Sequence, residues 1–225
     1  MIRLHMVVEG QTEEGFVNLL LVEHLAGMGI FADVRCVETS RTRRKIFRGG
    51  LLGYGRAKRD LHRWMKEDQN PEVRFTTMFD LYRLPADFPG YEDGKRKADP
   101  FARVRCLEES FGGDVSHPQF IPYIQLHEFE ALLLSDPTKF DTVFLNHDRA
   151  IGRLCKMAVG FESPEQIDDG DATAPSKRII NEIRQYRSQK ASAGPLIAEK
   201  IGLGNMRARC PHFREWLEKI EALAK

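Results

Sequence analysis

Apolar positions in the first half of the chain alternate between short β-like runs and longer stretches with helical spacing. Residues 1–8 form a β-branched, apolar run that stops at Glu9 and Gly10, which is typical of a buried strand followed by a turn. Further strand-like runs cover residues 33–37, 73–79 and 120–126. Helical spacing is predicted from Glu13 to the glycines at 27 and 29, over 57–65, and over 101–111 before the glycines at 112 and 113.

This alternation predicts an α/β protein with a mainly parallel sheet flanked by helices, because parallel neighbours need a crossover long enough to hold a helix. Beyond about residue 135 the β signal fades, and prolines at 137, 164 and 175 separate helical patches. A final amphipathic helix starts after Cys210 with proline in its first turn. We therefore expect an α/β core over residues 1–135 and a helical C-terminal region over 136–225 packed on it, or one single domain.

Composition narrows the functional classes. The 34 Lys and Arg residues against 33 Asp and Glu give a net charge of +1, so nucleic-acid binding must come from local clustering. The four cysteines lie far apart without C-x-x-C spacing, and no apolar stretch approaches the roughly 20 residues that cross a bilayer. We expect a cytoplasmic protein without a membrane segment. The Walker A pattern is missing, which argues against ATP hydrolysis.

Acidic residues follow three of the predicted strands. Glu9 and Glu13 come after the first, Asp80 after the third, and Glu128 and Glu130 after the fourth. In a parallel sheet the carboxyl ends of the strands meet at one edge, where functional groups gather. Carboxylates that converge there repel one another unless a cation lies between them, and oxygen-only sites suit Mg²⁺ or Mn²⁺. The pattern therefore predicts a divalent-metal site.

Local roles are the alternative for some of these residues. Glu13, Glu128 and Glu130 would each favour a helix N-terminus through its dipole, whereas an acid that ends a buried strand gains nothing from a dipole. His127, next to Glu128, would donate or accept a proton near pH 7, or would be an ordinary hydrogen-bonded histidine.

One dense basic cluster follows the second predicted strand. Its members are Arg41, Arg43, Arg44, Lys45, Arg48, Arg56, Lys58 and Arg59. Glycines in the same stretch would let the loop close over a phosphate backbone of DNA or RNA. A solvated surface loop is the alternative, because charge runs commonly serve solubility.

Four short motifs resemble a known family. The stretch at residues 9–13 looks like the E-G-x-T-E signature of Toprim domains in overcoming-lysogenization-defect nucleases. Together with residues 79–82, 122–133 and 210–217, it makes the chain similar, over most of its length, to the Toprim-related family known as domain of unknown function 4276.

The resemblance implies a Toprim fold, whose members include topoisomerases, primases and nucleases that act on phosphodiesters with Mg²⁺. It implies that Glu9 is a metal ligand or a general acid/base, and that the third strand ends in D-x-D. Here Tyr82 replaces the second acid, so Glu128 or Glu130 would have to supply the missing oxygen. Relatives are often paired with an ATPase in prokaryotic defence against phages and plasmids, which makes a separate ATPase subunit an expected partner.

Our leading hypothesis is a Mg²⁺- or Mn²⁺-dependent nuclease subunit. It assigns catalysis to Glu9, Asp80 and His127, and it assigns metal binding to Glu9, Glu13, Asp80, Glu128 and Glu130. A non-catalytic module that binds nucleic acid or a partner is the alternative favoured by Tyr82, and an enzyme acting on a small phosphorylated metabolite is a third. A second copy of the chain is a further candidate partner.

Overall fold

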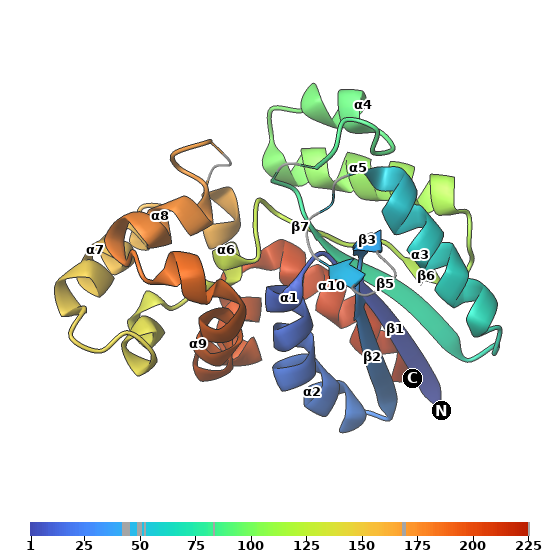
Figure 1. Cartoon of the computed structure of the whole chain (residues 1–225), viewed down its shortest axis with the longest axis horizontal. Helices are drawn as coiled ribbons and strands as arrows, with labels where there is room; N and C mark the ends of the chain where they lie inside the picture. Colours follow the sequence, from blue (N-terminus) through green and yellow to red (C-terminus); the bar gives the residue numbers. More distant parts are fainter. Residues whose placement is uncertain (42–45, 49–50, 52, 83, 168–169, 225) are drawn as a thin grey trace.

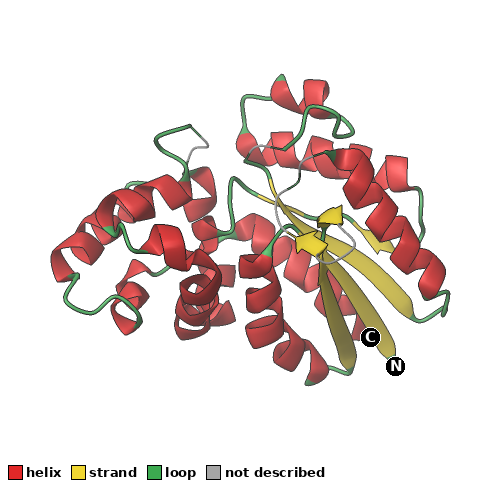
Figure 2. Cartoon of the chain, in the orientation of Figure 1, coloured by secondary structure: helices red, strands yellow, loops and turns green. Residues whose placement is uncertain are grey.

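The computed structural model describes residues 1–225 except 42–45, 49–50, 52, 83, 168–169 and 225, and of residues 38–41 and 46–48 it describes the backbone alone. A five-stranded sheet lies between two groups of helices, and a mainly helical region flanks it (Figure 1, Figure 2). No helix in the described residues is long and apolar enough to cross a membrane.

All pairings in the central sheet are parallel, which confirms the predicted class. The strands are β1 (Ile2–Val8), β2 (Ile30–Cys36), β5 (Val73–Asp80), β6 (Phe120–Ile121) and β7 (Ile124–Gln125). Their order is β2-β1-β5-β6, and β7 also pairs with β5. The register sets Val8 opposite both Cys36 and Met78, so β1 and β5 end side by side.

The fourth predicted strand, residues 120–126, is wrong as one element, because it is split into β6 and β7. Pro122 separates them and has no N–H to give to a strand ladder. The Thr77 hydroxyl bridges the break: it donates to the Tyr123 carbonyl at 2.9 Å and accepts the Tyr123 N–H at 3.1 Å. The chain thereby stays on β5 without a continuous ladder.

Helices cover both faces of the sheet, and alternate side chains of β1 face the two groups of helices. Leu4, Met6 and Val8 of β1 face α1 (Gln11–Phe16), the π-helical turn η1 (Val17–Leu21), α2 (Val22–Ala26) and the C-terminal α10 (Pro211–Glu221). Val7 belongs to the core of the opposite face, with α3 (Tyr54–Glu67) and α5 (Pro100–Val115). Because successive side chains of a strand point to opposite faces of the sheet, neighbouring residues of β1 belong to two separate cores.

Some predicted boundaries and one loop were wrong. The second strand covers Ile30–Cys36 rather than residues 33–37, and the first helix begins at Gln11 after Gly10. The two glycines at 112 and 113 lie inside α5, which ends at Val115 and is followed by Ser116 in a left-handed conformation, with φ 50°. The predicted basic loop contains an antiparallel pair, β3 (Glu38–Arg41) and β4 (Ile46–Arg48), and the short helix α4 (Tyr91–Lys95) lies in the long connection after β5.

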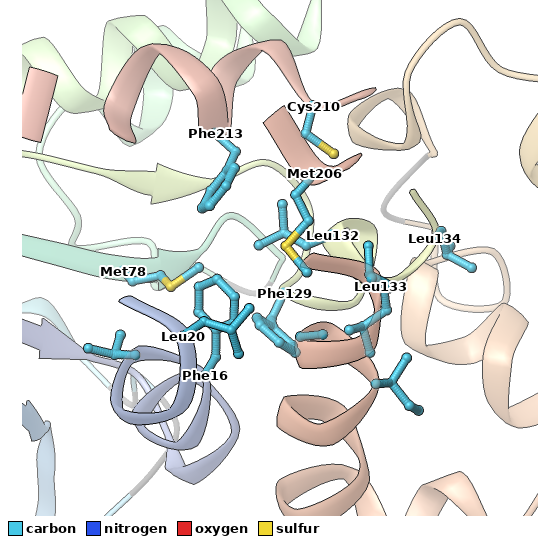
Figure 3. Close-up of a cluster of buried hydrophobic side chains, with 14 of the residues drawn as sticks. Phe16, Leu20, Met78, Phe129, Leu132, Leu133, Leu134, Met206, Cys210 and Phe213 are labelled. Atoms are coloured by element: carbon cyan, nitrogen blue, oxygen red, sulfur yellow. The ribbon is translucent and has the colours of Figure 1, made fainter. Parts of the chain in front are cut away.

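The C-terminal region is mainly helical, as predicted. Its elements are α6 (Glu130–Leu133), η2 (Pro137–Thr142), α7 (Asp148–Val159), η3 (Pro164–Gln166), α8 (Pro175–Glu182), α9 (Tyr186–Arg209), α10 and η4 (Ala222–Ala224). Its side chains share one apolar core with the sheet: Phe16 contacts Phe129 and Phe213, with ring centroids 5.3 Å and 6.1 Å apart (Figure 3). A domain boundary at residue 135 stays a prediction.

Candidate functional site: a buried acidic cluster at the carboxyl edge of the sheet

The acids that follow β1 and β5 lie next to each other. Glu9 comes directly after β1 and Asp80 is the last residue of β5. The Asp80 N–H donates to Glu9 Oε2 at 3.1 Å, and Asp80 Oδ1 accepts the Phe129 N–H at 2.9 Å. These two bonds join both strand ends to the segment that carries Glu128 and Glu130.

Glu13 completes the group from the first turn of α1, where its side chain is only 7% exposed. Burial, together with the charges of Glu9 and Glu130, raises its pKa from 4.5 to about 8 against the opposing effect of backbone hydrogen bonds. Burial also raises the pKa of Asp80 well above 3.8, and the neighbouring carboxylates, Glu13 first, add to the rise. A shared electrostatic environment therefore links these three acids.

The cluster extends to Glu128 and Glu130, each of which is anchored by the C-terminal region. Glu128 accepts the Ser176 N–H at 2.7 Å and the Ser176 hydroxyl at 2.9 Å, in the first turn of α8. Burial raises the pKa of Glu128, and the charge of Glu130 raises it further. The pKa of Glu9 is also raised, by burial first and then by the charges of Glu128 and Glu130.

Lys190 of α9 brings a positive charge to this group. Its Nζ lies 2.9 Å from Glu130 Oε1, which also accepts the Tyr186 hydroxyl at 3.2 Å. Burial lowers the pKa of Lys190, but the charges of Glu130 and Glu128 outweigh it and raise the pKa. Lys190 therefore stays charged and offsets the negative charge of Glu130.

The donor chemistry of the cluster fits a hard divalent cation, because every candidate ligand is a carboxylate oxygen. Within the described residues, however, no three acidic, histidine or cysteine side chains stand close enough to hold a metal ion as they are. Binding an ion would therefore require some of these side chains to change rotamer.

His127 and Tyr82 are near neighbours in sequence of the cluster residues Glu128 and Asp80, and a main-chain hydrogen bond joins them. His127 is buried and adopts a left-handed conformation, with φ 59°. Its carbonyl accepts the Tyr82 N–H at 2.7 Å. The Tyr82 hydroxyl donates to Asp171 Oδ1 at 3.4 Å, so the position of the second D-x-D acid contacts the loop before α8. A catalytic role of His127 stays a prediction.

Most of the predicted basic cluster cannot be placed. Arg43, Arg44 and Lys45 lie outside the described residues, and Arg41 and Arg48 lie in β3 and β4, of which only the backbone is described. The other three members, Arg56, Lys58 and Arg59, lie in the first two turns of α3. Lys58 forms an ion pair with Asp114 at 2.8 Å, and Tyr54 donates its hydroxyl to the same carboxylate. Lys58 is therefore paired within the chain, and its role in binding nucleic acid stays a prediction.

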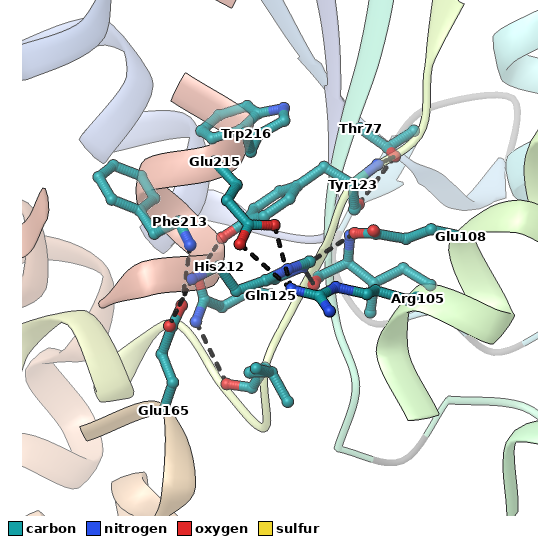
Figure 4. Close-up of polar contacts among 12 residues, drawn as sticks. Thr77, Arg105, Glu108, Tyr123, Gln125, Glu165, His212, Phe213, Glu215 and Trp216 are labelled. Carbon is teal, nitrogen blue, oxygen red and sulfur yellow. Dashed lines mark hydrogen bonds and ion pairs between the residues drawn. The ribbon is translucent and has the colours of Figure 1, made fainter. Parts of the chain in front are cut away.

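Sequence reasoning missed a second polar group, which is centred on His212 (Figure 4). His212 Nε2 lies 3.0 Å from Glu108 Oε1, which also accepts the Ile124 N–H at 2.8 Å. Glu165 accepts the N–H groups of His212 and Phe213 at 2.9 Å and 3.0 Å. This group therefore connects α5, η3 and α10 to β7, the strand that pairs with the end of β5 at Asp80.

Comparisons with known proteins give a family match and structural matches that each cover most or all of the chain. The family model described as "Domain of unknown function (DUF4276)" matches residues 8–221. Among solved structures, the C-terminal region of the Burkholderia pseudomallei OLD protein is similar with a TM-score of 0.48, 14% identity and complete coverage of both chains. That of Xanthomonas campestris pv. campestris gives 0.44 and 15%, over 100% of this chain and 96% of the other. A search of curated proteins finds no significant match.

Proposed function

This chain belongs to the family described as domain of unknown function DUF4276, and we propose that it is a Toprim-like, Mg²⁺- or Mn²⁺-dependent nuclease subunit. One observation carries the proposal. Glu9, Glu13 and Asp80 lie at the carboxyl edge of the sheet, where Glu13 is buried and the other two are half-buried, and all three have raised pKa values. At neutral pH a bound cation would replace the protons that these raised pKa values retain, and carboxylate oxygens are the ligands that a hard divalent cation prefers.

Each residue of the cluster would have its own role. Glu9, Glu13 and Asp80 would hold the ion, which when bound would neutralise a phosphate and activate water. Lys190 would hold Glu130 in place and would place a positive charge at the rim of the cluster. The hydrogen bonds from Ser176 fix the orientation of Glu128. His127 would move a proton between water and the leaving oxygen.

The proposal extends to partners. The phosphodiester substrate would be DNA or RNA, held in part by the basic cluster at residues 41–59. A separate ATPase subunit would control the activity, in defence against phages or plasmids.

A non-catalytic binding module is the second candidate, and Tyr82 is the observation that favours it. The residue at the second D-x-D position, Tyr82, donates its hydroxyl to Asp171, so this position supplies no carboxylate to the cluster. With one ligand fewer, the fold would retain nucleic-acid or partner binding without cleavage.

The test replaces Asp80 by Asn, which preserves size while it removes the charge that a divalent ion requires. Mn²⁺ binding is measured by electron paramagnetic resonance, and cleavage of labelled single-stranded DNA, duplex DNA and RNA is measured in Mg²⁺ and in Mn²⁺. We expect both metal affinity and cleavage to fall at least about 100-fold. Glu162→Gln removes an equal charge from an exposed position and should change neither.

The two measurements separate the candidates. If Asp80→Asn binds Mn²⁺ as the wild type does, the cluster is not a metal site and the nuclease proposal fails. If the wild type binds Mn²⁺ at Asp80 but cleaves none of the three substrates, alone or with an ATPase encoded beside it, the binding module is correct.

A further inference from the structure

A hollow of about 460 Å³ opens where α8 is followed by α9. Ile180 and Asn181 line it from the last turns of α8, and Arg184 and Arg187 line it from the connection and the first turn of α9. Two guanidinium groups present fixed arrays of N–H donors, and an amide adds one more donor group. Planar N–H donors at this density suit the oxygens of a phosphate.

No described carboxylate balances the positive charge at this hollow. Among the described residues, neither Arg184 nor Arg187 forms an ion pair with a carboxylate. The acid nearest in sequence, Glu182, already accepts Arg153 Nε at 2.6 Å. Two cationic side chains therefore line one hollow, and no described acid accounts for their position.

The two helices that form the hollow also hold the acidic cluster. The first turn of α8 binds Glu128 through Ser176, and the first two turns of α9 bind Glu130 through Tyr186 and Lys190. From Ser176 to Asn181 the rise along α8 is roughly 7 Å. Asn181, which lines the hollow, is therefore less than two helical turns from the residue that binds Glu128.

We propose that Arg184, Arg187 and Asn181 bind a backbone phosphate of the nucleic-acid strand, near the phosphate that reaches the acidic cluster. This inference rests on the proposed nuclease function and adds a substrate subsite to it. The guanidinium groups take the charge of the phosphate, and Ile180 provides an apolar wall against the adjoining sugar.

The test compares two double variants that each remove two positive charges. Arg184→Gln with Arg187→Gln changes the hollow, whereas Arg149→Gln with Lys156→Gln changes exposed positions on the neighbouring α7 that do not line it. Binding of fluorescent single-stranded and duplex oligonucleotides is followed by anisotropy in EDTA, over a series of salt concentrations. All four positions that are changed are exposed, and circular dichroism checks that both variants keep the fold.

The hollow variant should lower the slope of log Kd against log salt by about 0.7 to 0.9, which corresponds to one lost phosphate contact, and the α7 variant should keep the wild-type slope. Equal slopes for the hollow variant and the wild type would overturn the subsite and leave the nuclease proposal standing. A wild type that binds no oligonucleotide would instead overturn the proposed function. Tight binding of a mononucleotide with no gain for a longer strand would show a site for a free phosphate ester and would overturn the strand subsite.

Discussion

The carboxylate of Glu165 should be a main support of the C-terminal helix. Glu165 is fully buried in η3 and accepts the N–H groups of His212 and Phe213, the second and third residues of α10. The helix starts with Pro211, which has no N–H, so these two groups are the first donors at the helix end that need an acceptor. Replacing Glu165 by Ala would leave both of them buried without a partner.

The expected loss follows from that geometry. Each orphaned buried N–H costs about 1–3 kcal/mol, which gives about 2–6 kcal/mol for the pair. Burial raises the pKa of Glu165, although His212 and the two N–H groups oppose this rise, so removing the carboxylate returns part of its desolvation cost. We therefore expect Glu165→Ala to lower the free energy of unfolding by about 2–4 kcal/mol. Glu165→Gln, which keeps an acceptor oxygen, should lose about half as much.

Urea denaturation at pH 7 measures these losses, with tryptophan fluorescence as the signal. Trp216 lies in α10, is buried, and donates to the Thr76 hydroxyl at 3.0 Å, so it reports on this helix. The exposed neighbour Glu162, changed to Ala, is the matched control and should stay within about 0.5 kcal/mol of the wild type. If Glu165→Ala also stays within about 0.5 kcal/mol, the carboxylate does not hold the helix end and the reasoning is refuted.

Three further outcomes are expected. In the absence of metal, the free energy of unfolding should fall as pH rises from about 4.5 to about 8, because the folded pKa of Glu13 lies above its unfolded value. A pH series of urea melts measures this dependence, and Glu13→Gln should flatten it. Lys190→Met leaves the buried Glu130 without its ion pair and should cost about 1–3 kcal/mol, whereas the exposed Lys200→Met should cost almost nothing in the same assay. In Gly15→Ala the new Cβ would lie 2.7 Å from Pro195 Cγ, where α1 packs on α9. The free energy of unfolding should therefore fall by about 1–3 kcal/mol. An unchanged melting temperature in thermal unfolding would contradict this close packing.

The convergence of Glu9 and Asp80 could be predicted because it needs only the sheet topology. Each residue follows a buried run, and parallel neighbours bring their carboxyl ends to one edge. Local exceptions were harder to foresee. Pro122 divides a strand whose apolar pattern is continuous, and the side chain that repairs the break, Thr77, lies on a different strand.

The residues that surround the cluster could not be found from spacing. Ser176 and Lys190 lie 48 and 60 positions beyond the acids they bind, in helical patches without a distinctive motif. Their contribution depends on how α8 and α9 dock, which is decided by tertiary packing rather than by local pattern. The motif around Cys210 was recognised by resemblance, but its physical function, the anchoring of α10 through His212, became visible only when Glu108 and Glu165 were placed.

Glu13 is the residue at which the local and the metal-binding interpretations of the cluster differ most. An acid that only favours a helix dipole works from an exposed position, where the helix N-terminus stabilises its charged form. Glu13 is instead buried, and its pKa is raised to about 8. Near neutral pH its side chain is then largely protonated without a cation, and a bound cation would displace that proton. Metal affinity should accordingly rise with pH up to about 8, a linkage that a first-turn acid with a purely local role would not produce.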